Sequence, residues 1–127
     1  MKYNIVSIAI TLPIIIVIGI IFMAYTQNVA NTYIDATRRL EENVRNGQWE
    51  QAQKELSDMA AGWNSKKQLL QLWAVHKDTD DVSKYLLEAQ VGITLRDERL
   101  LFVSTANLAE SLEHLHHKDD LNLSNII

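Results

Sequence analysis

The stretch IVSIAITLPIIIVIGIIFMAY, from Ile5 to Tyr25, decides the fold of the N-terminal part of the chain. It carries no charged side chain, and its length meets the roughly 20 apolar residues that a helix needs to cross the hydrocarbon core of a bilayer. A lone strand of this composition would leave its backbone groups unpaired in lipid, so we expect a helix. Tyr3 and Tyr25 lie at its two ends, where an amphipathic ring suits the headgroup layer. The sequence therefore predicts a membrane anchor over residues 1–25.

Two other interpretations of this segment are a cleaved signal peptide and a buried core helix. A signal peptide has a shorter apolar region that ends at a small-x-small cleavage site. Here the run is longer. The two candidate sites end at Ala24 and Ala30, and neither fits the motif, because the residues two positions earlier are Phe22 and Asn28 and not small apolar residues. A core helix of this length would carry a polar face. We expect an uncleaved anchor, with membrane lipid around residues 5–25.

The orientation of the anchor is less well determined by the sequence than its existence. Counting only Lys and Arg favours a cytoplasmic C-terminal side, but the first basic residue after the run is Arg38, and acidic residues are mixed with the basic ones. The absence of Cys is compatible with an oxidising compartment. We expect a single-pass membrane protein with an extracytoplasmic C-terminal domain.

Composition excludes several classes of function. The chain has 12 Lys and Arg against 16 Asp and Glu, a net charge of −4, so it lacks the clustered positive charge that binds nucleic acid. Without Cys there is no disulfide framework, no thiolate metal site and no thiol nucleophile. One Pro and four Gly argue against a turn-rich β fold.

Apolar residues after the anchor recur with a helical period. From Gln48 they form a heptad stripe in which Lys66 fills one apolar position. The members of this stripe are Trp49, Ala52, Leu56, Met59, Trp63, Leu70 and Trp73. Asn46 and Gly47 supply a break before it. The pattern predicts helices over about 26–45 and 48–76, joined by a short turn that makes them antiparallel.

A second break is expected at residues 77–79, where Asp78 or Thr79 would cap the next helix. Residues 80–117 then read as one long helix, or as two nearly continuous ones, because Gly92 and Asp97 mark a candidate interruption. The tail over 119–127 is apolar enough to dock on the helices. The sequence thus predicts an all-α fold: an N-terminal transmembrane helix that continues into a small antiparallel bundle of three or four long helices, with the helical domain over 26–127.

No complete catalytic or metal-binding set is visible, so we expect no catalytic residue, no cofactor and no metal. The three Trp residues, Trp49, Trp63 and Trp73, fill a core or line a groove for a partner helix. His114 and His117 share a helix face three residues apart, which suits a metal ion, but a helix-end charge role explains them as well. His76 lies at the expected turn.

The order of these elements resembles a family of short bacterial membrane-anchored proteins, domain of unknown function 4363. The residues that carry the resemblance are Gly47, Trp49, Ala52, Leu56, Trp63, His76, the Leu-Glu-His-Leu run over 112–115 with His114, and the closing Asn125, Ile126 and Ile127. The last residue is Ile where the family typically has Leu. The resemblance implies no activity; it implies that His76 and Asn125 act as hydrogen-bonding pins in the bundle.

These observations favour a non-catalytic accessory or assembly partner of another membrane protein. The alternative is an extracytoplasmic sensor or ligand-binding bundle that acts through a partner.

Overall fold

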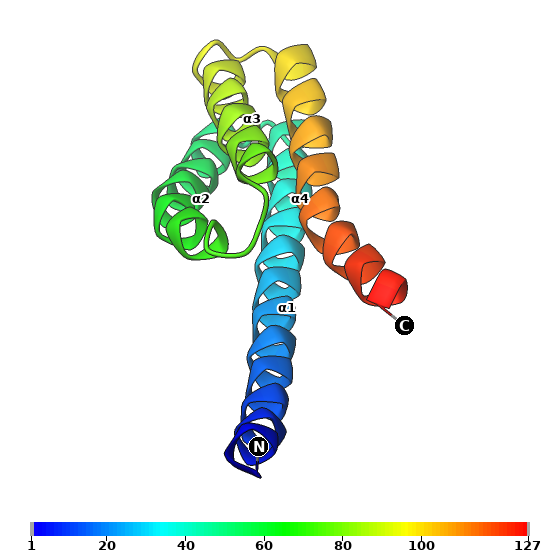
Figure 1. The fold of residues 1–127 in the computed structure, drawn as a ribbon. Coiled ribbons are helices and arrows are strands. Elements are labelled where there is room, and N and C mark those ends of the chain that lie inside the picture. Colours follow the sequence, from blue (N-terminus) through cyan, green and yellow to red (C-terminus); the bar gives the residue numbers. More distant parts are fainter. Residues whose placement is uncertain (1, 127) are drawn as a thin grey trace.

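Four helices make up the described part of the chain. The computed structural model describes the backbone of residues 2–126 and the side chains of Lys2 and of residues 4–115. The helices are α1 (Lys2–Arg45), α2 (Trp49–Leu70), α3 (His76–Thr94) and α4 (Glu98–Ile126), and no strand occurs in the described range (Figure 1). The predicted all-α class is confirmed, in its four-helix form.

Each helix packs against two neighbours, so that the order of contact is α1, α2, α3, α4 and back to α1. The stripes predicted from the sequence face this shared core. Its fully buried large side chains include one or more from every helix: Leu40 and Val44, Leu56, Trp63 and Leu70, Val82, and Leu101, Leu108 and Leu112. Burying such side chains supplies the main favourable free energy of folding, because the helices have little stability alone.

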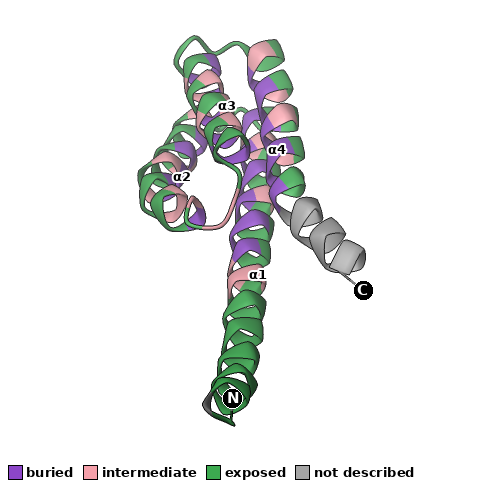
Figure 2. Cartoon of the chain, in the orientation of Figure 1, coloured by how far each residue is buried: buried purple, intermediate pink, exposed green. Residues whose placement is uncertain are grey.

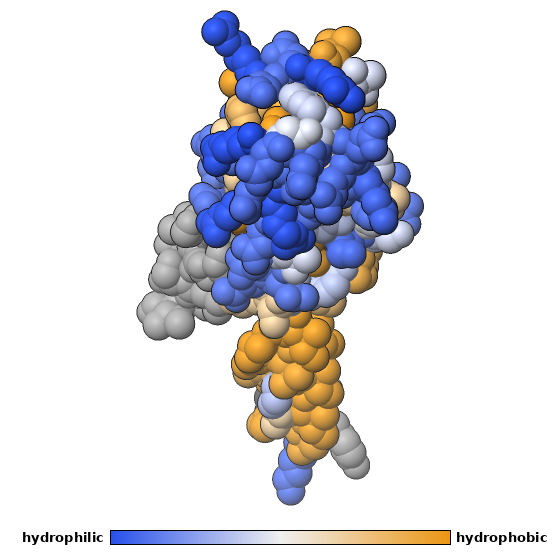
Figure 3. Space-filling view, turned by 180° about the vertical axis from the view of Figure 1, so that it is seen from behind, coloured by the Kyte–Doolittle hydropathy of each residue, from blue (hydrophilic) through white to orange (hydrophobic). Residues whose placement is uncertain are grey.

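The longest helix, α1, has two different halves. Its apolar side chains from Ile5 to Ile21 are all exposed, whereas from Thr26 to Val44 one face is buried (Figure 2). The exposed half protrudes from the packed helices and is apolar on the face seen in Figure 3, while hydrophilic side chains cover most of the packed part. The helix is long and apolar enough there to cross a membrane.

The first break is where the sequence places it. Gly47 adopts a left-handed backbone with φ of 76°, a conformation that costs glycine nothing. The second break comes earlier than predicted: α2 ends at Leu70 and α3 begins at His76, so residues 71–75 form the connection. The predicted capping by Asp78 or Thr79 is wrong, because both lie inside α3 and are buried, and the residue before the helix is Val75.

A third break divides the stretch predicted over 80–117. Arg96 has a positive φ of 51°, and the carboxylate of Asp97 accepts a hydrogen bond from the backbone N–H of Leu100 at 3.1 Å, which caps α4. The two helices then pack closely: a Cβ on Gly92 would lie 3.0 Å from the backbone nitrogen of Leu101. The interpretation as one long helix is therefore wrong. The backbone of 119–126 continues α4; the predicted docking of that tail rests on side chains outside the described residues.

Candidate functional site

The connection between α2 and α3 reaches back to α1 through Trp73. Its ring stacks on Phe22 with centroids 4.1 Å apart and meets the edge of Tyr25 at 6.1 Å. Its Nε1–H donates a hydrogen bond of 2.9 Å to Oγ1 of Thr26. Three contacts from one side chain therefore fix the connection to α1, where the exposed half meets the buried half.

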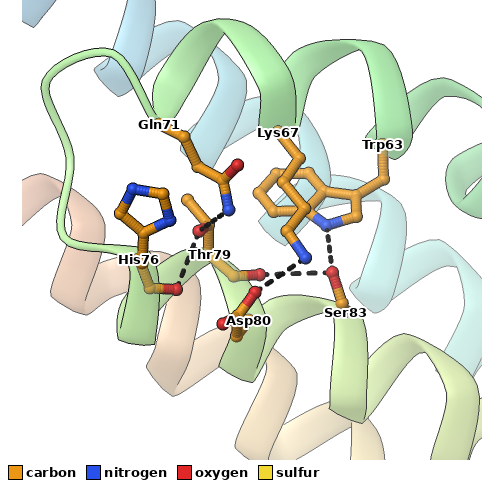
Figure 4. Close-up of polar contacts among 7 residues, drawn as sticks. All are labelled: Trp63, Lys67, Gln71, His76, Thr79, Asp80 and Ser83. Carbon is orange, nitrogen blue, oxygen red and sulfur yellow. Dashed lines mark hydrogen bonds and ion pairs between the residues drawn. The ribbon is translucent and has the colours of Figure 1, made fainter.

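A chain of hydrogen bonds joins the end of α2 to the start of α3 (Figure 4). The indole Nε1–H of Trp63 donates to Oγ of Ser83 at 2.8 Å, and that hydroxyl donates to the carbonyl of Thr79 at 3.3 Å. The amide of Gln71 donates to Oγ1 of Thr79, which in turn donates to the carbonyl of His76. These bonds satisfy the buried polar groups at this corner, which would otherwise be costly to bury.

One ion pair crosses the same corner on its outer side. Nζ of Lys67 lies 2.7 Å from Oδ1 of Asp80. The hydrogen bond from Lys67 is the main reason that the pKa of Asp80 falls below its ordinary 3.8. Asp80 is exposed, so this pair orients the two helices more than it stabilises them.

Trp63 occupies the centre of the core. It is 1% exposed and meets the ring of Tyr33 edge-on at 5.8 Å. The hydroxyl of Tyr33 donates to the carbonyl of Met59 at 3.2 Å. Burial, followed by the proximity of Tyr25, raises the pKa of Tyr33 above its ordinary 10.0. Aromatic packing therefore couples α1 to α2 in this cluster, and the hydrogen bond from Trp63 to Ser83 adds α3.

The other sequence-selected residues lie apart from this cluster. Trp49 begins α2 and lines a shallow depression of about 390 Å³ at the far end of α1, together with Gly47 and Arg96. The side chain of His114 is exposed on α4, 3.9 Å from Glu110. Asn125 lies among the residues whose side chains are not described. The structure thus spreads the three Trp residues along the bundle and gathers them into no common groove.

His76 contributes to the corner through its backbone. Its carbonyl accepts the hydrogen bond from Thr79, while its ring is exposed at the surface (Figure 4). The hydrogen bond at this position therefore uses the backbone of His76, whereas the resemblance implied a hydrogen bond that holds the bundle together through its side chain. Among residues with described side chains, no three His, Asp or Glu groups come close enough together to hold a metal ion.

Comparison with known protein families gives a match over most of the chain. The family model described as Domain of unknown function (DUF4363) matches residues 20–126. The chain belongs to this family. No curated protein and no solved structure matches it significantly. The match to DUF4363 covers α2, α3, α4 and the C-terminal part of α1. It begins just before Phe22 and Tyr25, the two rings that receive Trp73.

Several partners in this DUF4363 chain had no signal in the sequence. Phe22 is the only Phe in the apolar run, but nothing in the run indicates that Trp73 is its partner, and Thr26 and Ser83 are isolated hydroxyls. Their roles appear only when Trp73 and Trp63 reach them from positions far along the chain.

Proposed function

We propose that this protein is a membrane-anchored, non-catalytic helical domain that serves as an accessory or assembly partner of another membrane protein. The observation that carries the proposal is the continuity of α1, in which one helix supplies both the exposed apolar half and part of the buried core. Such a helix joins an anchor to a domain without a hinge.

The exposed half of α1 fits lipid in length and in chemistry. Residues 5–25 span about 30 Å as a helix, close to the thickness of the hydrocarbon core. The hydroxyl of Thr11 is already hydrogen-bonded to the carbonyl of Ser7 at 2.7 Å, which lowers the cost of placing it in lipid. Lipid around these side chains would remove from water an apolar surface far larger than soluble proteins expose.

The junction between the two halves is stiff. No Gly or Pro occurs between Ile20 and Arg45, and the helix is unbroken there. A stiff junction holds the domain in one orientation relative to the bilayer. That property suits a protein whose task is to present a surface to a neighbour in the same membrane.

The outer face of α3 offers such a surface. Leu87 and Val91 on α3, and Leu95 directly after its last residue, follow one another at intervals of four residues and are 62%, 44% and 66% exposed. Residues at this spacing lie in one line along a helix. Scattered exposed apolar residues are ordinary, but a continuous line of them is typical of a protein contact. We assign this α3 stripe (Leu87, Val91, Leu95) as the surface for the partner.

A sensor or ligand-binding role is the second candidate. It is favoured by a depression of about 300 Å³ between α1 and α2, lined by Tyr33, Arg39, Glu55 and Lys66 among others. That volume is at the lower end of what small-molecule sites show. A small molecule that co-purifies with the protein and is lost on changing Arg39→Ala would favour this role over the first.

Crosslinking in living cells tests the proposed role. A benzophenone amino acid in place of Val91 should give one defined product with a membrane protein after irradiation, and the change Leu87→Ser should weaken it. The same probe at Lys54, an exposed residue of α2, is the control and should give no such product. Equal products from both positions, or none from either, would remove the support for a partner at α3.

Mass spectrometry of the protein purified from membranes tests the anchor separately. The expected N-terminus is Met1 or Lys2. A mature product that begins between residues 25 and 31 would show a cleaved signal peptide, and the anchored role would then be lost whatever the crosslinking shows.

A further inference from the structure

A second apolar surface lies on the connection between α2 and α3. Leu72 is 74% exposed and Val75 is 53% exposed, and Leu69 in the last turn of α2 is also exposed. Together these three residues form what we call the corner patch (Leu69, Leu72, Val75). Large apolar side chains on a tight connection are unusual, since connections that face water are mostly polar.

The position of the corner patch is fixed relative to the apolar half of α1. Trp73, which directly follows Leu72, stacks on Phe22 and donates a hydrogen bond to Thr26. These α1 residues mark the level at which the exposed half ends. In Figure 1 the connection accordingly lies on the side of the helix assembly that faces the N-terminal half of α1, while the connection between α3 and α4 lies at the opposite end.

We propose that the corner patch enters the surface layer of the bilayer and gives the domain a second attachment to lipid. This inference rests on the proposed anchoring of residues 5–25. If that segment fills the hydrocarbon core, its end near Tyr25 lies at the interface, and Trp73 brings the corner patch to the same level. Trp and Tyr are enriched at this depth, because their rings have one apolar and one polar part.

The backbone of the connection is suited to a layer that is poor in water. The N–H groups of Gln71, Leu72, Trp73 and Ala74 all donate to carbonyls of residues 67–70, at distances of 2.8–3.2 Å. An unpaired backbone group would resist leaving water, and these donors are already paired. The side chain of Leu72 therefore enters the layer with its own N–H and those of its two neighbours already paired.

The charges around the corner patch are balanced, so the attachment depends on apolar contact. Lys67 pairs with Asp80 at 2.7 Å and Lys77 pairs with Asp81 at 3.3 Å. Two cations that are matched by two carboxylates give little net attraction to anionic headgroups. The same attachment is accordingly expected on a bilayer of neutral lipid.

Spin labelling in a neutral bilayer tests this inference. The chain contains no Cys, so a single Cys introduced by Leu72→Cys or Val75→Cys carries the only nitroxide. The full-length protein is placed in phosphatidylcholine nanodiscs, one copy per disc. Collision rates with oxygen, which concentrates in lipid, and with a water-soluble nickel chelate then report the depth of each label.

Leu95→Cys is the matched control in water, because Leu95 is 66% exposed on the connection at the opposite end. Ile14→Cys is the matched control in lipid, because Ile14 lies in the middle of the apolar run. The expected result is a ratio of oxygen to nickel collisions at 72 and 75 that is several-fold above the ratio at 95 and below that at 14.

Three outcomes would overturn the inference, and they are distinguishable. Ratios at 72 and 75 equal to that at 95, with a lipid value at 14, would leave the anchor intact and place the corner patch in water. Low collision rates with both reagents at 72 would mean that protein covers the patch. A water value at 14 would remove the anchor itself, and the second attachment with it.

Discussion

The two halves of α1 share one backbone geometry and differ in the pattern of their apolar side chains. Residues 5–21 are apolar around the whole helix, and the structure covers none of their large side chains. Residues 26–44 are apolar along one stripe, and the other helices cover that stripe. A stripe matches a protein core on one side, whereas a full apolar circumference matches a solvent that surrounds the helix. The surface of residues 26–44 therefore matches protein, whereas the surface of residues 5–21 matches lipid.

The sharpest test makes one substitution in both halves. Leu40 is fully buried, so Leu40→Ala is expected to lower the free energy of unfolding by about 2–5 kcal/mol, since it removes buried methyl groups and leaves a cavity. Leu12→Ala, in the exposed half, should leave that free energy unchanged. Denaturant titration of both variants in detergent micelles measures the difference. Equal losses would show that the two halves share one packed environment.

An introduced charge should affect the exposed half of α1 more than the half that follows it. Val17→Arg places a cation in the middle of the exposed half and is expected to oppose membrane insertion by about 2.5–3.5 kcal/mol. Gln27→Arg, at an exposed position just beyond it, should not oppose insertion. Fractionation of membranes with and without alkaline washing reports the bound share of each variant. Retention of the Val17 variant at the wild-type level would argue against a lipid environment.

Adding a single methyl group at two glycines compares a packed position in α3 with an open position in the exposed half of α1. Gly92→Ala would press a Cβ against the backbone of Leu101, at 3.0 Å, and is expected to cost about 1–3 kcal/mol by forcing α3 and α4 apart. Gly19→Ala has nothing within 4 Å of the new Cβ and should be neutral for the packed helices. Thermal melts followed by circular dichroism compare the two. A neutral Gly92 variant would show that α3 and α4 separate without loss.

The smallest expected effect concerns Tyr33 in the buried half. Tyr33→Phe removes the hydrogen bond to the carbonyl of Met59 and should cost about 0.5–1.5 kcal/mol near neutral pH. Because burial raises the pKa of the folded protein's Tyr33 above 10.0, its contribution is full below pH 10 and is lost as the pH rises through the folded pKa. Unfolding titrations at neutral and alkaline pH should converge for wild type and variant. A gap that stays constant across this range would contradict the assignment.

The helices of this fold could be predicted because apolar residues recur in the sequence with a helical period. The heptad stripe predicted from Trp49 to Trp73 includes the buried face of α2, from Ala52 to Leu70. The uncharged run coincides with the exposed half of α1. Helix ends were harder to place. Nothing local in residues 71–75 interrupts a helix, and α2 ends there as Trp73 turns to Phe22 and Thr26, a tertiary preference that overrides the local pattern.

The candidate site was predictable only in part, for a related reason. Trp63 and Trp73 stand out as rare large side chains, but their partners Ser83 and Thr26 are common residues at unremarkable positions. His76 stood out in the same way, and its role in the structure belongs to its carbonyl, which every residue possesses. A sequence gives the identity of each side chain, but it does not show which backbone carbonyls accept hydrogen bonds in the folded protein.

The unbroken helix between the two halves of α1 also sets the direction in which the domain faces. An α-helix turns by about 100° and rises 1.5 Å for each residue. One residue inserted after Gly19 would leave the contact of Trp73 with Phe22 intact, because both lie beyond the insertion. It would nonetheless swing the α3 stripe by about a quarter turn relative to the first residues of the helix. If residues 5–25 anchor the chain as proposed, the length of the apolar segment therefore sets the side on which the α3 stripe lies relative to a neighbour that contacts the start of the helix.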